Sequence, residues 1–156
     1  MPQVEDKLKE LGIELYPPTE SKGPANLVSV IQTGNLLFVG GHPPRKPDGS
    51  IILGKVGGDL TFEEGYEAGK WAAVTLLSSV KNAIGDLDKI NRIVKVLAMF
   101  NVDPNFTQIS EIANGCTDLF EKIWGPERGL PTRSAVGMAS MPRGFSCEIE
   151  MTAELK

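Results

Sequence analysis

The chain has 156 residues, the usual length of a single domain built around one hydrophobic core. Its 16 basic and 20 acidic residues give a formal net charge of -4, which argues against nucleic acid as a partner because phosphate binding needs a basic surface. One histidine and two cysteines are too few for a zinc site of the common Cys/His kind, and any catalytic triad would have to use His42.

The two cysteines and the N-terminus bear on location. Cys116 and Cys147 are isolated thiols in a chain large enough to need no disulfide, so we expect them to be buried in a protein of the reducing cytosol. The charged N-terminal residues lack the apolar stretch of a signal peptide, and no apolar run approaches the roughly 18 residues that span a bilayer. These features predict a soluble, cytoplasmic protein with no membrane partner.

The first elements are a helix and a hairpin. Apolar residues at helical spacing before Gly12 predict a short amphipathic helix over residues 4–11, which can be a mere appendage. Apolar runs over residues 27–32 and 36–39 flank the turn residues 33–35. This pattern predicts the first two strands as a β-hairpin.

The next segment contains a loop and a long helix. The Gly- and Pro-rich residues 40–44 should end the second strand, and residues 45–59 predict a long surface loop of the kind that often carries function. Thr61 and Glu64 form a capping-box pattern that starts a helix, and Gly85 should end it. The apolar stripe of this helix comprises Phe62, Tyr66, Gly69, Ala73, Leu76, Val80 and Ile84.

The middle of the chain predicts a central strand and a second helix. Residues 93–102 are apolar on both faces of the expected strand, so both faces of the sheet must be covered. Residues 106–124 predict the second long helix, closed by Gly125-Pro126. Two helices can cover one face, so we expect the other face to pack against another subunit.

The last segment predicts a hairpin of residues 133–141 and 145–155, joined by a turn at 142–144. In its second strand one face carries Phe145, Cys147, Ile149 and Met151, and the other carries Ser146, Glu148, Glu150 and Thr152. The predicted fold is therefore α+β with the order β-β-α-β-α-β-β, a mixed sheet, and two helices packed on one face.

Charged residues near the C-terminus are the first candidates for chemistry. Glu148 and Glu150 share a strand face, and the predicted hairpin puts them within reach of Arg133 on the adjacent strand. The planar guanidinium suits a carboxylate of the protein or of a small acid. The alternatives are a salt bridge on a solvated sheet face and a site for an acidic ligand.

Two further sites combine glycine with a polar side chain. Asn114-Gly115 lies within a helical pattern, where it is either a local kink or an amide that binds a ligand beside a residue that leaves room. His42 follows Gly40 and Gly41 at the end of a strand, where a ligand can approach closely, although a histidine of a surface loop is the alternative.

The C-terminal segment resembles the signature of the RidA/YjgF family, also called the L-PSP endoribonuclease family. The resemblance rests on Pro131-Thr132-Arg133-Ser134-Ala135-Val136, on Pro142 and on Glu148-Ile149-Glu150. Further agreement lies in Gly23-Pro24, in residues 33–39 and in residues 93–96. The resemblance covers residues 23–155, which leaves residues 1–22 as an N-terminal extension with a short helix before a family domain at 23–156.

The resemblance implies a chorismate-mutase-like fold, assembled as a homotrimer with ligand pockets at the subunit interfaces. It also implies hydrolysis of reactive enamines and imines of 2-amino acids to 2-oxo acids and ammonia, without a metal or organic cofactor. Carried over by position, Arg133 matches the residue that clamps the substrate carboxylate, and Glu148 the residue that handles the attacking water. Asn114 matches the helix asparagine of the family.

The chain differs from active deaminases of the family at three positions. Gly40 stands in place of a serine, residues 25–27 in place of a tyrosine, and Ala135 in place of a cysteine. His42 is a candidate to replace the serine, with Gly40 and Gly41 lining the same end of the pocket. A small-carboxylate-binding regulatory or protective protein and an endoribonuclease-type translation inhibitor are the alternatives to a deaminase that takes 2-imino acids.

Overall fold

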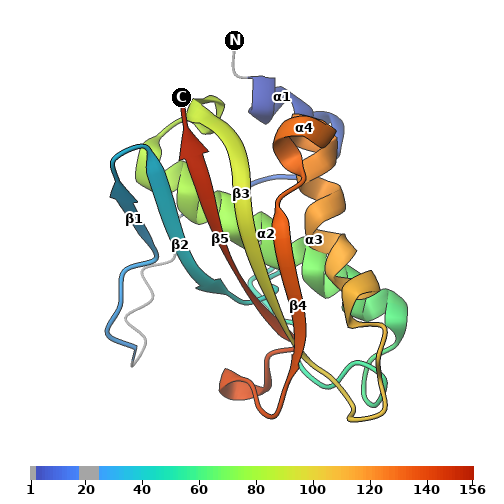
Figure 1. The fold of residues 1–156 in the computed structure, drawn as a ribbon. Helices are drawn as coiled ribbons and strands as arrows, with labels where there is room; N and C mark the ends of the chain where they lie inside the picture. Colours follow the sequence, from blue (N-terminus) through green and yellow to red (C-terminus); the bar gives the residue numbers. More distant parts are fainter. Residues whose placement is uncertain (1–2, 18–24) are drawn as a thin grey trace.

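A computed structural model of the chain describes residues 3–17 and 25–156. In this part of the chain a five-stranded mixed sheet has the strand order β1-β2-β5-β3-β4 (Figure 1). The strands are β1 (Val30–Thr33), β2 (Leu36–His42), β3 (Ile90–Asn101), β4 (Thr132–Met138) and β5 (Cys147–Leu155). The helices are α1 (Gln3–Glu10), α2 (Phe62–Ile84), α3 (Ile109–Trp124) and α4 (Pro126–Gly129), with short 3-10 turns at Leu87–Lys89 and Pro142–Gly144. The predicted α+β class and element order are confirmed.

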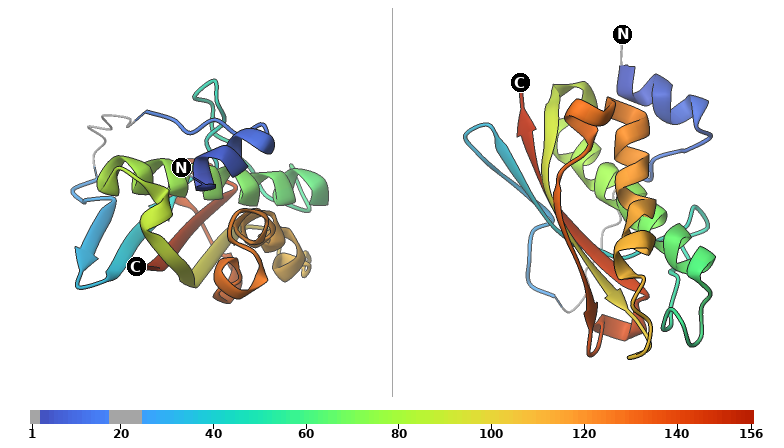
Figure 2. Two further views of the ribbon diagram at one scale, coloured as in Figure 1. Left: turned by 90° about the horizontal axis from the view of Figure 1, so that it is seen from above. Right: turned by 45° about the vertical axis from the view of Figure 1, so that its right-hand side comes forward.

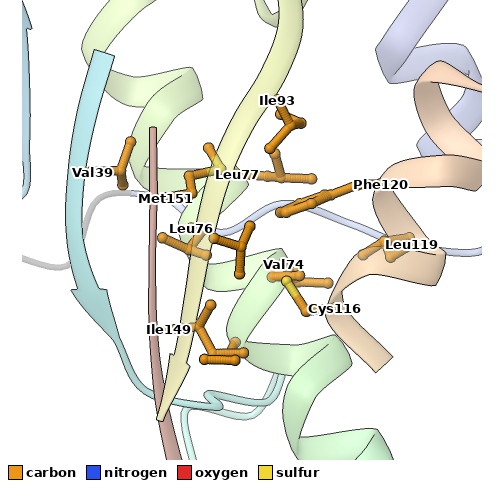
Figure 3. Packing of buried hydrophobic residues seen from close by; sticks show 14 of the residues in the cluster. Val39, Val74, Leu76, Leu77, Ile93, Cys116, Leu119, Phe120, Ile149 and Met151 are labelled. Carbon is orange, nitrogen blue, oxygen red and sulfur yellow. The ribbon is translucent and has the colours of Figure 1, made fainter. Parts of the chain in front are cut away.

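Helices α2 and α3 lie together on one face of the sheet, as predicted (Figure 2). The hydrophobic core fills the space between these layers, and Figure 3 shows part of it. Its labelled members are Val39, Val74, Leu76, Leu77, Ile93, Cys116, Leu119, Phe120, Ile149 and Met151. Cys116 and Cys147 are both buried, as predicted, and burial raises the pKa of each thiol above its usual range.

The N-terminal helix is tied to the rest of the domain. Its Val4 and Leu8 side chains are buried in the core. The Asp88 carboxylate accepts hydrogen bonds from the backbone N–H groups of Gln3 (2.8 Å) and Val4 (2.9 Å), which satisfies donors at the start of α1. The expected boundary between residues 22 and 23, with Gly23-Pro24, lies outside the described residues.

The first hairpin has the predicted two strands and turn. β1 and β2 pair antiparallel from Val30↔Val39 to Thr33↔Leu36, and Gly34 in the turn has a φ of 60°. The second strand ends within residues 40–44, as predicted, but β2 continues through both glycines to His42. A register shift between Val39 and His42 in the pairing with β5 absorbs the two glycines as a bulge.

The segment predicted as a surface loop, residues 45–59, is only partly one. The ends of β5 and β3 diverge, and residues 52–56 lie between them: Ser146 N–H donates to Ile52 O (3.0 Å) and Val56 N–H donates to Asn101 O (2.9 Å). The Val56 side chain is fully buried. The prediction of a loop followed from the Pro and Gly residues around this segment, and composition alone does not show that residues 52–56 pair with the strands.

Helix α2 begins and ends as predicted. Thr61 and Glu64 form the complete capping box, and the N–H of Gly85 donates to Lys81 O at the C-terminus. Glycine lets the helix lie close to its neighbours: a Cβ on Gly65 would lie 2.8 Å from Val56 Cγ1, and one on Gly69 would lie 3.0 Å from Ile112 O.

The predicted hairpin of the last two strands is wrong. β4 pairs parallel with β3, β5 pairs antiparallel with β3 on its other side, and β4 and β5 are therefore separated by β3 (Figure 1). The cause is α3, which makes β3, α3 and β4 a crossover unit whose strands must run parallel. The short turn at 142–144 then passes the end of β3 rather than joining neighbouring strands.

The sheet face away from the helices is open in the single chain. Apolar side chains on this open face include Ile31, Phe38 and Val136, which are 51%, 50% and 39% exposed. That this face packs against another subunit stays a prediction, and the exposed apolar residues support it.

Candidate functional site

Arg133 lies on β4, the edge strand, and its guanidinium packs against α3. Its Nη1 donates hydrogen bonds to Asn114 Oδ1 (2.8 Å) and Thr117 Oγ1 (2.9 Å). Its Nη2 donates to both the backbone oxygen and the hydroxyl of Ser110, each at 3.0 Å. The structure thus brings the two predicted residues Arg133 and Asn114 together.

These contacts engage both terminal nitrogens of the guanidinium. Of the five N–H donors of arginine, the Nε–H of Arg133 has no acceptor among the described residues. Ser110 and Thr117 were missed in the sequence, although they share a helix face with Asn114 at spacings of four and three residues. Arg133 therefore holds a fixed positive charge at the sheet edge.

Gly115 serves helix packing. Helix α3 is continuous from Ile109 to Trp124, so the predicted alternative of a kink at Asn114-Gly115 is wrong. A Cβ on Gly115 would lie 1.9 Å from the backbone oxygen of Tyr66 in α2. The absent side chain makes room for the neighbouring helix, and Asn114 is free to face Arg133.

Glu148 lies on the open face of β5, next to the bulge of β2. A Cβ on Gly41 would come within 2.1 Å of Glu148 Oε1, so the carboxylate occupies the space above this glycine. Gly40 is exposed beside it. Burial, and then the charge of Glu150, raise the pKa of Glu148 above its usual range. Among the described residues, its carboxylate has no hydrogen-bond or ion-pair partner.

Arg133 and Glu148 belong to opposite faces of the sheet. Arg133 pairs with Val96, whose side chain is fully buried under the helices, and Glu148 pairs with Met99 on the open face. The prediction that Glu148 and Glu150 lie on a strand adjacent to Arg133 is wrong, because β3 intervenes. The predicted site residues thus form two groups, which we call the arginine half-site (Arg133 and Asn114) and the glutamate half-site (Glu148, Gly40 and Gly41).

His42 belongs to neither half-site. Its side chain is 7% exposed, with Nδ1 2.7 Å from Gly40 O and Nε2 2.7 Å from Ser79 Oγ of α2. It pairs with Ile149, whose side chain is fully buried under the helices, so it points away from Glu148. Burial, the largest effect, lowers the pKa of His42 below its usual range. The reading of His42 as a surface-loop residue is wrong.

Metal ligation, membrane-spanning helices and cavities are further features of the described residues that bear on function. Within residues 3–17 and 25–156, no group of three or more His, Cys, Asp or Glu side chains is arranged to hold an ion. None of the helices described is long and apolar enough to cross a membrane. A cavity of about 300 Å³ lies between α2 and the segment before it, and no residue of either half-site lines it. It is lined by Lys46, Ile52, Leu60, Glu63, Glu64, Glu67 and Trp71.

Comparison with known proteins gives close relatives over nearly the full chain. Protein TCP17 of Trypanosoma cruzi is 37% identical over 153 residues, which cover 98% of this chain and 94% of that protein. The crystal structure of Atu1372 from Agrobacterium tumefaciens, a protein of unknown function, is 37% identical with a TM-score of 0.87, covering 98% and 94% of the two chains.

A crystal structure described as a putative endoribonuclease from Shewanella oneidensis is 28% identical with a TM-score of 0.89, covering 97% of this chain and 99% of that one. The model of the family described as "YjgF/chorismate mutase-like, putative endoribonuclease" matches residues 5–155, which include most of α1. The mixed sheet with its helices on one face therefore belongs to a known fold. The chain is a member of the YjgF/chorismate mutase-like family.

Proposed function

We propose that the protein hydrolyses reactive enamines and imines of 2-amino acids to 2-oxo acids and ammonia, without a cofactor, in pockets between two copies of the chain. The observation that carries this proposal is the carboxylate of Glu148, which is half-buried, has a raised pKa, and has no hydrogen-bond or ion-pair partner within residues 3–17 and 25–156. A carboxylate with a pKa nearer neutrality is a more effective general base.

The proposed reaction starts with water held by Glu148. The carboxylate takes a proton from the water as the oxygen bonds to the C=N carbon, and Glu148 then gives that proton to the imine nitrogen, so that a carbinolamine forms. Glu148 next takes the hydroxyl proton of the carbinolamine and delivers it to the amine as the C=O bond forms and the C–N bond breaks, so that the products are the 2-oxo acid and ammonia. The atoms of one water and one imine account for both products.

In the proposed pocket, the arginine half-site belongs to a neighbouring copy of the chain. Because Arg133 and Glu148 face opposite sides of one sheet, a pocket that contains both needs two subunits. The exposed Phe38 and Ile31 on the open face support such an assembly, a homotrimer in our proposal. Arg133 of one copy would then hold the carboxylate of the 2-imino acid, and Asn114 would fix the guanidinium.

The test is a rate measurement with a matched control. An amino-acid oxidase generates 2-iminopropanoate from alanine, and the decay of the imine is followed with and without the protein. We expect acceleration by the wild type, a large loss in Glu148→Gln, and little change in Glu127→Gln, which alters an exposed carboxylate of α4. No acceleration by the wild type would refute the proposal.

A second candidate, a non-catalytic protein that binds small carboxylates, is favoured by one observation. Gly40 stands where active deaminases of the family have a serine and Ala135 where they often have a cysteine, so pocket groups are missing while Arg133 is kept. Binding of pyruvate by calorimetry without any turnover of the imine would support this candidate. An endoribonuclease, the activity in the family description, predicts RNA cleavage that Glu148→Gln abolishes.

A further inference from the structure

The segment between the ends of β3 and β5 brings a lysine to the open face. Val56 in this segment points toward α2, because a Cβ on Gly65 of that helix would lie 2.8 Å from Val56 Cγ1. Neighbouring residues of an extended segment point to opposite sides, so Lys55 points to the open face. Its Nζ donates a hydrogen bond to Asn101 Oδ1 at 2.9 Å.

This ammonium group lies near the glutamate half-site. Asn101 follows Met99 by two residues on β3, and Met99 is paired with Glu148. Such diagonal neighbours on a sheet face have Cα atoms about 7–8 Å apart, which long side chains can bridge. Lys55 and Glu148 are thus close on one face, yet none of the ion pairs among the described residues includes either of them.

The ammonium of Lys55 has no protein counter-ion in the part of the chain that the structure describes. Its acceptor is the neutral amide of Asn101, a residue only 6% exposed. The nearby Asp59 carboxylate accepts from the backbone N–H of Lys55 (2.9 Å) instead. A charge withdrawn from water is costly unless an opposite charge pairs with it, and a second copy over the open face would withdraw this one.

We propose that Lys55 binds a second carboxylate of the substrate, so that the pocket is built for 2-imino dicarboxylic acids. This inference rests on the proposed function. When Glu148 faces the C=N carbon and Arg133 of the neighbouring copy holds the adjacent carboxylate, the side chain of the substrate is the remaining part that can reach Lys55. A carboxylate at its end supplies the missing counter-ion.

Calorimetry with stable 2-oxo acids tests this assignment without requiring turnover. 2-Oxoglutarate carries the second carboxylate and pyruvate lacks it. We expect the wild type to bind 2-oxoglutarate more tightly, and Lys55→Met to weaken 2-oxoglutarate about ten-fold while leaving pyruvate unchanged, since one charge-assisted hydrogen bond is lost. Lys55→Arg should retain most of the preference. Lys46→Met, at an exposed lysine that precedes this segment, is the matched control and should change neither affinity.

Two results would overturn the assignment: an equal loss of both ligands in Lys55→Met, or no loss of either. Thermal unfolding of each variant shows that the fold is intact. Imine decay, measured with substrates made from alanine and from glutamate, separates the two proposals. Lys55-dependent binding of 2-oxoglutarate without turnover refutes the deaminase and supports the role of Lys55. Turnover of both imines that is unchanged in Lys55→Met supports the deaminase and refutes the role of Lys55.

Discussion

The carboxylate of Glu148 lies over Gly41 so closely that a methyl group at residue 41 would come within 2.1 Å of Oε1 and 2.6 Å of Cγ. Real Cβ atoms do not approach other atoms this closely, so even alanine would move the Glu148 side chain. The glycine in the bulge of β2 therefore determines where the proposed general base sits. A serine or alanine at this position is incompatible with the observed position of the carboxylate.

Gly41→Ala should accordingly impair the proposed reaction. We expect kcat for 2-iminopropanoate to fall at least about ten-fold, because a displaced base no longer meets the attacking water. Gly58→Ala, outside both half-sites, is the control: a Cβ there has no contact closer than 3.7 Å, and activity should be retained. Steady-state kinetics and thermal unfolding of both variants provide the comparison. Equal activity of the two variants would contradict this account of Gly41.

Complementation between inactive variants tests whether the pocket is shared between copies. Glu148→Gln and Arg133→Ala should each be inactive alone. After mixed refolding in equal amounts, about a quarter of the interfaces in a closed ring pair an intact Glu148 with an intact Arg133, so about a quarter of wild-type activity should return. If both residues served one pocket within a single chain, the mixture would stay inactive.

The buried His42 predicts a pH dependence of stability. Burial lowers its pKa in the folded state, so as the pH falls the unfolded chain takes up the proton first. The free energy of unfolding should therefore fall as the pH drops below about 6.5, by up to about 1.4 kcal/mol per pH unit, and this contribution should be constant above that pH.

Urea unfolding of wild type and His42→Gln between pH 7.5 and 5.0 isolates this contribution, because the other titrating groups are common to both proteins. The unfolding free energy of the wild type minus that of His42→Gln should decrease as the pH falls. A difference that does not vary with pH would mean that His42 titrates alike in the folded and unfolded chain.

Gly115→Ala should destabilise the domain. The added Cβ would lie 1.9 Å from Tyr66 O and 2.9 Å from Tyr66 C, both backbone atoms of α2, so the two helices would have to separate. We expect a loss of about 1–3 kcal/mol or more, in the range of overpacked cores. Gly58→Ala, whose Cβ would have no contact closer than 3.7 Å, should be nearly neutral in the same urea titration.

Local patterns in the sequence predicted local structure well. The turn at Gly34, the capping box of Thr61 and Glu64, and the alternation that buries Ile149 each depend on residues close in sequence. These features obey short-range rules of backbone geometry and hydrogen bonding, so one sequence suffices to find them.

The pairing of β4 and β5 could not be read in the same way. Alternation shows which side of a strand is buried, but it does not say which strand lies next to it, and β3 separates Arg133 from Glu148 through contacts between distant residues. Likewise, the Pro- and Gly-rich composition around Val56 gave no sign that this residue reaches the core. The acceptors Ser110 and Thr117 could have been found from their helical spacing around Asn114.

The segment at residues 52–56 also ties the position of Lys55, the proposed ligand-binding residue, to the unfolding of the whole sheet. The Val56 N–H donates to Asn101 O at 2.9 Å, and Asp103 N–H donates to Val56 O at 2.9 Å, so the residue after Lys55 is bonded on both sides. With its side chain in the core, Val56 can release these bonds only when the sheet itself opens. Its amide hydrogen should exchange with solvent among the slowest in the protein, and Lys55 should keep its place without any ligand to order it.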